Sequence, residues 1–305
     1  MSNMDVANSV VTYMRLKEEE EDYQCEDYLS KLKRDCPNAS NLVDRTCRKL
    51  MAYWCFQVVD RCRFSRETVA IAMNMLDRFL GSASGHHVLK DRHVFQLASM
   101  TCLYTAIKLY EQEALSPKVI ESLSQGKHSE KDILAMELDV LFAIQWKCHP
   151  PTALGFVQYL LEVHSPLSEE EQLQIYNLTK IQIEWTVIHY KYSIHEKAST
   201  IALAVLSNVK ELLLDVDYSW YFGYLSVILS KSGERVETLR KKLKEELQIE
   251  FPHELAELYE QHSVKEAIRC KNQQKSSTRK DSCSSSSPIG IFLQSDRMQK
   301  SKDRV

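Results

Sequence analysis

Two segments decide the fold class of this chain: CRKLMAYWCFQVVDRC at residues 47–62 and SRETVAIAMNMLDRFLG at residues 65–81. In both, apolar residues recur at intervals of three and four, which is typical of an amphipathic α-helix that buries one face. We expect Ser40 and Ser65 to cap these helices, because a serine hydroxyl before an apolar stripe accepts an otherwise free backbone N–H. Gly81 is the predicted end of the second helix.

Three more helices are predicted to complete a first group of five. One runs from about Asp91 to Glu111 and carries small residues on several faces, which indicates the most buried helix of the group. Ser116 and Pro117 are the predicted start of a short helix, because proline fits the first helical position. Ser129, with Asp132 three residues later, resembles a capping box and begins the fifth helix.

A second group of five helices follows the break at Pro150 and Pro151. Ser168 is the predicted cap of its longest helix, at about 169–190. The third helix of this group, at about 196–213, is again rich in small residues, so the pattern of the first group repeats. We therefore predict a duplicated five-helix unit, and the other helices of the second group are expected at about 154–161, 218–229 and 235–247.

Composition supports an all-helical protein. Glycine and proline contribute only 7 residues each to the 305 of the chain, which leaves few sites for tight turns. No apolar run reaches the roughly 18 residues of a membrane span, and the start of the chain lacks the pattern of a secretion signal. Nine cysteines, an odd number without a Cys-x-x-Cys pair, predict reduced thiols in an intracellular protein.

The two ends of the chain differ from its body. At the N-terminus we expect one amphipathic helix from Tyr13 to Leu32, with the acidic run Glu18 to Asp22 as its solvated face. At the other end, residues 270–305 carry eight Lys/Arg, three Asp and nine Ser, which predicts a basic, disordered tail. The rest of the chain then has a net charge of −8, which argues against direct binding of nucleic acid.

Motifs of catalysis are absent from the sequence, and we predict no enzymatic activity, no cofactor and no metal. The chain has no glycine-rich phosphate loop, no nucleophile elbow and no His-Glu-x-x-His motif. His86, His87 and His93, together with Asp91, suggest a metalloenzyme as an alternative, because imidazole and carboxylate bind zinc or iron. We favour solvent-exposed loop histidines, since no second helix supplies ligands at the spacing of di-iron bundles.

Five strings resemble a cyclin box: CRKLMAYW (47–54), SRETV (65–69), NMLDRFL (74–80), AIKLYE (106–111) and MELDVL (136–141). The resemblance covers about residues 13–262 and implies two tandem five-helix cyclin boxes preceded by an outer helix. The stretch KEEEEDYQCEDYL (17–29) is also similar to N-terminal helices in the expanded cyclin set of diatoms. The expected parts are an N-terminal extension at 1–39, a first box at 40–149, a second box at 150–262 and the tail at 263–305.

The resemblance assigns roles to four charged residues. Arg48 and Asp77 occupy the positions of a buried ion pair in the family, and the role that this implies is structural. Lys108 and Glu137 occupy the positions with which the family grips a cyclin-dependent kinase, and we expect both at the surface of the free chain. Without the resemblance, each would be interpreted as an ordinary solvated helix charge.

The resemblance also implies a patch that docks substrates or inhibitors of the kinase. It maps to Cys47, Leu50, Met51, Trp54, Gln57 and Gln96. Cys47 replaces the usual methionine and Gln57 the usual acidic residue, so an apolar groove is expected without a carboxylate for a substrate arginine. Leu50, Met51 and Trp54 are alternatively plain core residues, as their helical spacing alone indicates.

The function implied is that of a regulatory subunit in cell-cycle control, which binds and activates a cyclin-dependent Ser/Thr kinase in the nucleus and cytoplasm. The partners expected are this kinase and its substrates or inhibitors, without nucleic acid or membrane. A cyclin-fold adaptor in transcription is the alternative. Ser287 precedes Pro288 in the tail and is a candidate site for a proline-directed kinase, whose phosphate adds about −1.5 to −2 charges.

Overall fold

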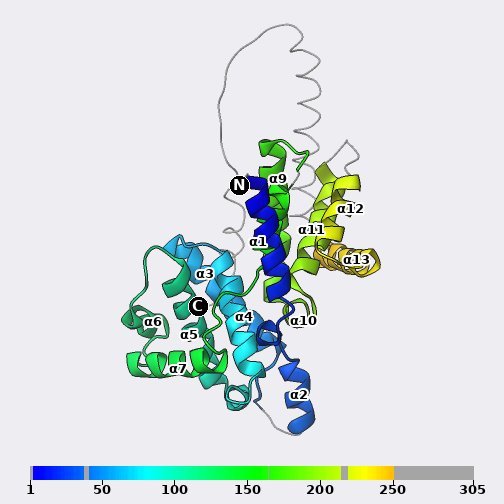
Figure 1. Cartoon of the computed structure of the whole chain (residues 1–305). Coiled ribbons are helices and arrows are strands. Elements are labelled where there is room, and N and C mark those ends of the chain that lie inside the picture. The colour runs from blue at the N-terminus through cyan, green and yellow to red at the C-terminus, as the bar shows by residue number, and fades with distance from the viewer. Residues whose placement is uncertain (1–2, 38–40, 164, 214–218, 251–305) are drawn as a thin grey trace, which may run out of the picture. The chain divides into compact units, whose positions relative to one another are not determined.

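The computed structural model describes residues 3–37, 41–163, 165–213 and 219–250, in which every regular element is a helix (Figure 1). The predicted all-α class is thereby confirmed. The predicted tail and Ser287 lie outside the described residues. The first five-helix repeat consists of α3 (Arg45–Cys62), α4 (Glu67–Gly81), α5 (Arg92–Tyr110), α6 (Pro117–Leu123) and α7 (Glu130–Ala143), with a short 3-10 helix at His86–Lys90 between α4 and α5.

The second repeat contains one short helix more than the sequence predicts. Its helices are α8 (Ala153–Glu162), α9 (Glu169–Ile188), α10 (Tyr190–His195), α11 (Ala198–Leu213), α12 (Ser219–Ile228) and α13 (Gly233–Glu250). The helix expected at about 169–190 is present as α9 and ends at Ile188, because His189 leaves the helical conformation with φ −95° and ψ 110°. Its ring Nδ1 donates to the carbonyl of Trp185 at 2.8 Å, and the chain then enters α10.

The predicted capping box at Ser129 and the predicted cap at Ser168 are both present, and Ser168 also forms a capping box. Ser129 and Asp132 begin α7, and Ser168 and Glu171 begin α9, each with reciprocal hydrogen bonds between side chain and backbone. The cap predicted for the first helix is wrong, since α3 begins at Arg45 and the Asp44 carboxylate accepts the N–H of Cys47 at 2.8 Å. Ser40 itself lies outside the described residues. Ser65 accepts the N–H of Glu67 at 3.3 Å, one residue before the cap position of α4.

The N-terminal region is not one helix from Tyr13 to Leu32. It forms α1 (Asn3–Lys17), a 3-10 turn at Glu21–Tyr23 and α2 (Tyr28–Asp35). The acidic run between them is also not a plain solvated face, because Glu18 is buried and bonded to Ser199. Helix α1 packs against α8 of the second repeat, so the N-terminal region does lie on the outside of the helical body, as expected (Figure 1).

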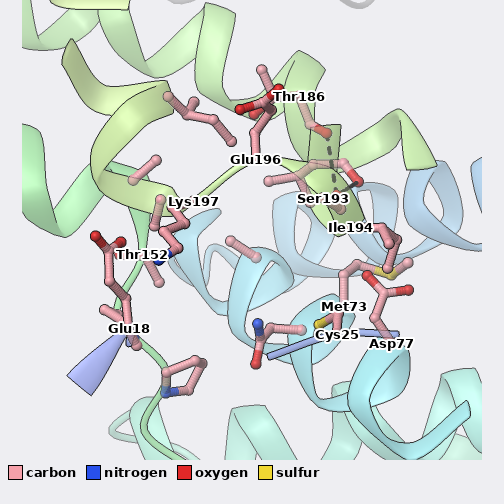
Figure 2. A pocket seen from close by; sticks show the side chains of 18 of the residues that line it. Glu18, Cys25, Met73, Asp77, Thr152, Thr186, Ser193, Ile194, Glu196 and Lys197 are labelled. Carbon is pink, nitrogen blue, oxygen red and sulfur yellow. Dashed lines mark hydrogen bonds between the residues drawn. The ribbon is translucent and has the colours of Figure 1, made fainter. Parts of the chain in front are cut away.

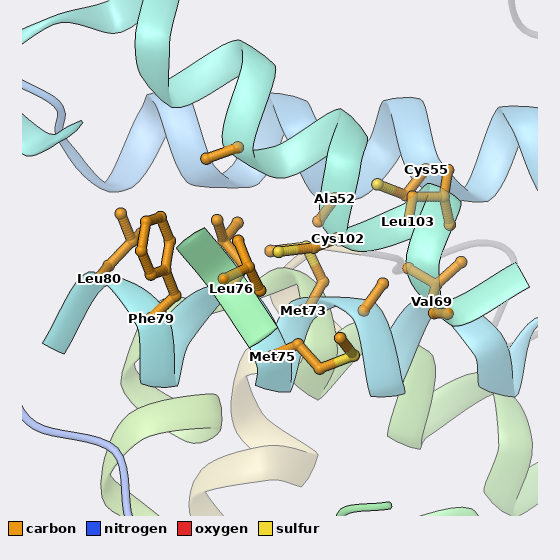
Figure 3. Close-up of a cluster of buried hydrophobic side chains, with 14 of the residues drawn as sticks. Ala52, Cys55, Val69, Met73, Met75, Leu76, Phe79, Leu80, Cys102 and Leu103 are labelled. Atoms are coloured by element: carbon orange, nitrogen blue, oxygen red, sulfur yellow. The ribbon is translucent and has the colours of Figure 1, made fainter. Parts of the chain in front are cut away.

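The core of each repeat surrounds its small-residue helix. Helix α5 contacts α3, α4 and α7, and α11 contacts α8, α9 and α13. The small side chains of α5 permit close approach, and eleven of its residues are buried. Figure 3 shows where three helices of the first repeat meet: Ala52 and Cys55 come from α3, Met73 and Leu76 from α4, and Cys102 and Leu103 from α5. The predicted burial of this central helix is confirmed.

Two general expectations are also addressed by the described residues. No helix among them is both long and apolar enough to cross a membrane. The seven cysteines in this part of the chain are free thiols. The remaining two, Cys270 and Cys283, lie outside it.

Candidate functional site

Arg48 and Asp77 are brought together in the interior of the first repeat. Arg48 donates from Nε to Asp77 Oδ1 at 2.8 Å and from Nη2 to Oδ2 at 2.7 Å, the bidentate geometry of a strong ion pair. Asp77 also accepts the hydroxyl of Tyr28 in α2 at 2.9 Å. Arg48 Nη1 donates to the carbonyl of Val187 in α9 at 2.9 Å. The pair therefore joins the N-terminal region and both repeats.

Lys108 and Glu137 also lie together, at the side of the first repeat where α5 ends beside α7. The Lys108 ammonium is 2.5 Å from Glu137 Oε1, and the hydroxyl of Thr105 donates to the same oxygen at 2.9 Å. Glu137 is buried, so the expectation that both charges lie on the surface is wrong for this residue. Lys108 is partly exposed and is the member of the pair that solvent or a partner can reach.

An exposed apolar stripe on α7, which was not predicted from the sequence, flanks this ion pair. Leu134, Leu138 and Phe142 follow one another at intervals of four residues and are all exposed, Phe142 by 67%. Trp146, just beyond the helix, is 57% exposed and meets Phe142 edge to face with ring centroids 5.9 Å apart. Leu109, next to Lys108, is exposed as well. The repeat itself does not cover these apolar side chains.

The signal for this stripe was present in the sequence, because α7 is apolar on two faces. The apolar side chains of one face are buried in the core: Ile133, Met136, Val140, Leu141 and Ile144. A surface helix needs only one apolar face, so a second one is a candidate binding surface.

The six residues of the expected docking patch lie on α3 and α5 with different exposure. Leu50 is 63% exposed and is therefore not a core residue. Met51 and Trp54 are partly buried and pack against a small cluster formed by Met100, Tyr104, Ile120 and Ile133. The remaining three, Cys47, Gln57 and Gln96, are exposed or partly exposed. The face thus combines free and packed apolar side chains, while a docking role stays a prediction.

The histidines considered as metal ligands do not converge. His86 lies 3.8 Å from Asp35, whereas His87 donates from Nδ1 to the carbonyl of Ser84 at 2.7 Å. His93 instead lies against His128, with ring centroids 4.3 Å apart and the ring planes tilted by 41°. No group of three or more metal-ligating side chains occurs within the described ranges.

A cavity of about 190 Å³ lies between the two repeats, beneath the N-terminal region (Figure 2). Glu18 and Cys25 line it from the N-terminal side, and Met73 and Asp77 line it from α4. Burial raises the pKa of Cys25 to about 12, which keeps the thiol protonated and unreactive at neutral pH. Asp77 is already paired with Arg48. Cys25 is therefore not an activated nucleophile, and Asp77 is not a free acid–base group.

Comparisons with known proteins agree with this architecture. Residues 9–149 match the family model described as the N-terminal domain of cyclins. The chain is 29% identical to cyclin-G1 of Mus musculus over 148 residues, 47% of this chain and 48% of that protein. It is 24% identical to cyclin-A1-3 of Oryza sativa subsp. japonica over 225 residues, 73% of this chain and 43% of that protein. It thus spans less than half of the length of these relatives.

A solved structure shows the same fold. The viral cyclin from herpesvirus saimiri superposes with a TM-score of 0.53 at 17% identity, over 72% of this chain and 97% of the viral chain. The similarity of residues 17–29 to the diatom set stays a prediction. The repeat of helices around α5 and the match of the family model over it lead to one conclusion: residues 9–149 form a domain of the family described as the N-terminal domain of cyclins.

Proposed function

We propose that this chain is a regulatory subunit that binds and activates a cyclin-dependent Ser/Thr kinase. The observation that carries the proposal is the surface formed by Lys108, Glu137, Leu134, Leu138, Phe142 and Trp146, called the kinase surface below. The match of residues 9–149 to the N-terminal domain of cyclins supports the choice of a kinase as the partner. The chain performs no chemistry itself. Its effect is to favour the active placement of the kinase αC helix and activation loop.

The physical form of the kinase surface suits a partner helix. Residues at intervals of four make one ridge along α7, and such a ridge packs into the groove of a second helix. Lys108 is already held by Glu137, so its ammonium loses little side-chain freedom when it meets acceptors on the partner. Exposed aromatic side chains such as Phe142 and Trp146 are the kind that dominate the free energy of binding at interfaces.

The test compares the apolar stripe with a matched exposed leucine. The variant Leu138→Ala/Phe142→Ala is expected to weaken kinase binding by about tenfold or more, while the melting temperature stays close to that of the parent. The control Leu173→Ala removes a 60% exposed leucine from α9. It should change neither kinase binding nor the melting temperature. Equal kinase affinity of the stripe variant and the control contradicts the proposal.

The ion pair of the surface is tested by removing both partners together. Lys108→Ala alone leaves Glu137 buried without its cation, a change that lowers stability in its own right. Lys108→Ala/Glu137→Ala avoids the unpaired charge and should abolish activation of the kinase while the protein keeps its helicity. The kinase itself is identified by affinity purification of the full chain, with Leu138→Ala/Phe142→Ala as the negative control.

The remaining roles extend this proposal to substrates and location. The patch at Cys47, Leu50, Met51, Trp54, Gln57 and Gln96 is proposed to dock apolar segments of kinase substrates or inhibitors. Leu50 supplies an exposed apolar contact for such a segment, and Trp54 supplies a partly buried wall. The complex is proposed to act in cell-cycle control, in the nucleus and cytoplasm, and fluorescence microscopy of the tagged full chain through the cell cycle tests this.

A further inference from the structure

The turn that carries Trp146 has an unusual backbone. Directly after α7, Gln145 has φ 53° and Trp146 has φ 60°. Two successive residues other than glycine thus occupy the left-handed region, which costs conformational energy and persists only where the surroundings enforce it. The strained turn places Trp146 against Phe142 on the kinase surface. Whatever holds this turn therefore also shapes the kinase surface.

Arg78 of α4 holds the turn from inside. Its Nη1 donates to the carbonyl of Lys147 at 2.7 Å, and its Nη2 donates to the carbonyl of Ile144 at 3.2 Å. The two strained residues lie between these carbonyls. Arg78 is buried, and desolvation lowers its pKa, so the charged guanidinium needs further stabilisation.

That stabilisation comes from residues 18–23, the acidic run Glu18 to Asp22 together with Tyr23, which we call the strap. The ring of Tyr23 lies 4.8 Å from Arg78 Cζ, within the range of a cation–π contact. Asp22 forms an ion pair with the ammonium of Lys147, and Glu20 lies 3.5 Å from the same ammonium. The strap thus contacts both Arg78 and the first residue after the strained pair.

The other end of the strap is fixed to the second repeat. Glu18 is buried and accepts the N–H of Ser199, at the start of α11, at 3.1 Å. It is also 2.9 Å from the ammonium of Lys231, while Glu19 forms an ion pair with Lys197. Carboxylates at a helix N-terminus are favourable because they meet free N–H groups and the positive end of the helix dipole. Glu18 and Lys197 lie beside the cavity between the repeats (Figure 2).

We propose that the strap is a positioning element, which holds the turn at 145–146 in the conformation that the kinase binds. It links the second repeat, through Glu18, to the kinase surface, through Asp22 and Tyr23. The inference rests on the proposed function and adds a means of regulation to it. Any partner or modification that displaces the strap would relax the turn and weaken kinase binding without touching the kinase surface.

The test variant is Asp22→Asn/Tyr23→Leu in the full chain, which removes the ion pair of Asp22 with Lys147 and the contact of Tyr23 with Arg78. The matched control is Glu21→Gln, because Glu21 belongs to the same run and its side chain is exposed. The chain contains four tryptophans, so ¹⁹F NMR of protein labelled with 5-fluorotryptophan gives one resonance for each. Trp146→Phe assigns the resonance of Trp146, and Trp54 serves as an internal reference in the same repeat.

The expected result is a shifted or broadened Trp146 resonance in the strap variant, an unchanged Trp54 resonance, and kinase affinity reduced by about tenfold. The control should match the parent in all three measurements. If the double variant fails to fold, Lys147→Met removes the ion pair from the side of the turn and should give the same pattern. A lower melting temperature with an unmoved Trp146 resonance overturns the positioning role and makes the strap merely structural.

The outcomes also separate this inference from the proposed function. A moved Trp146 resonance with unchanged kinase affinity overturns the coupling between strap and kinase. In that case Leu138→Ala/Phe142→Ala decides whether the kinase surface itself is correct, because this variant leaves the strap intact. Weak kinase binding by that variant supports the proposed function and contradicts only the positioning role of the strap. Full kinase binding contradicts both the proposed function and the positioning role.

Discussion

The guanidinium of Arg48 meets the carboxylate of Asp77 through two hydrogen bonds of 2.8 and 2.7 Å, and neither side chain is more than 1% exposed. Water therefore cannot replace either partner when the other is removed. Tyr28 and Val187 add hydrogen bonds from two further helical regions. The pair is the point at which the N-terminal region, the first repeat and the second repeat are joined.

We expect Asp77→Asn to lower the free energy of unfolding by about 3–5 kcal/mol, because Arg48 stays buried without its counter-charge. Urea unfolding followed by circular dichroism measures this loss. The control is Arg92→Gln, which breaks a 3.3 Å pair with Asp44 whose side chains are 47% and 53% exposed. That change should cost about 1 kcal/mol or less. Similar costs for the two variants contradict the structural role of the buried pair.

The sequence predicts the fold well where the signal is local. Ser129 with Asp132 is a capping box in the sequence and in the structure, since all of its groups lie within four residues. The acidic run is the opposite case. Glu18 is hydrogen-bonded to Ser199, 181 positions further along the chain. No local sequence pattern predicts such a contact. The split of the N-terminal helix follows from the same long-range contacts.

The candidate site likewise contains features that the sequence predicts and features that it does not. The pairing of Lys108 with Glu137 required the family resemblance, because charge spacing alone equally predicts two solvated residues. The stripe containing Leu138 and Phe142 was missed for another reason: α7 is apolar on two faces, and periodicity does not tell which face is buried. The strained turn at Trp146 has no sequence signal at all, since glycine is the residue that normally marks a positive φ.

The docking patch is tested by separating exposed from packed residues. Leu50→Ala should weaken binding of an apolar substrate peptide with little change in stability, because this side chain is exposed. Trp54→Ala should reduce both, with a packing loss of up to about 3–5 kcal/mol. The loss of stability in Met51→Ala should lie between the losses in Leu50→Ala and Trp54→Ala. Peptide affinity is measured by fluorescence anisotropy and stability by urea unfolding, and unchanged affinity in Leu50→Ala contradicts the patch.

The neutral side chain of Gln57 leads to a separate prediction about how peptide affinity depends on salt concentration. A groove without a carboxylate at this position gains little from a substrate arginine, so peptide affinity should vary little between about 50 and about 300 mM salt. The same anisotropy titration, repeated at each salt concentration, measures this. A steep salt dependence that disappears on substitution of a nearby acidic residue would show that the patch is assigned to the wrong residues.

The C-terminal tail is expected to be dispensable for activation of the kinase. Deletion of residues 270–305 should leave the melting temperature and kinase activation unchanged, because a serine-rich basic segment buries little apolar surface. Ser287→Asp, which mimics part of the charge of a phosphate, should likewise leave both unchanged and affect only turnover or location. A substantially lower melting temperature of the truncated chain would make the tail part of the fold.

The contact between His93 and His128 predicts a pH dependence of stability. His128 is buried, and its Nε2 has no hydrogen-bond partner among the described residues. Burial lowers the pKa of His128 below its ordinary 6.5, and the neighbouring imidazole of His93 lowers it further, against the opposite effect of Asp132. Protonation in the folded state would thus place an unpaired charge inside the first repeat.

The sign of the effect follows from proton uptake. Below pH 6.5 the unfolded chain binds a proton at His128 that the folded chain does not, so stability falls as the pH drops through 6.5 and levels off below the lowered pKa. Urea unfolding at about pH 7.5 and about pH 5.5 should show this loss in the parent and a smaller loss in His128→Gln. His87→Gln, a change at an exposed loop histidine, should keep the pH dependence of the parent. Equal slopes for parent and His128→Gln would assign the acid sensitivity to other groups.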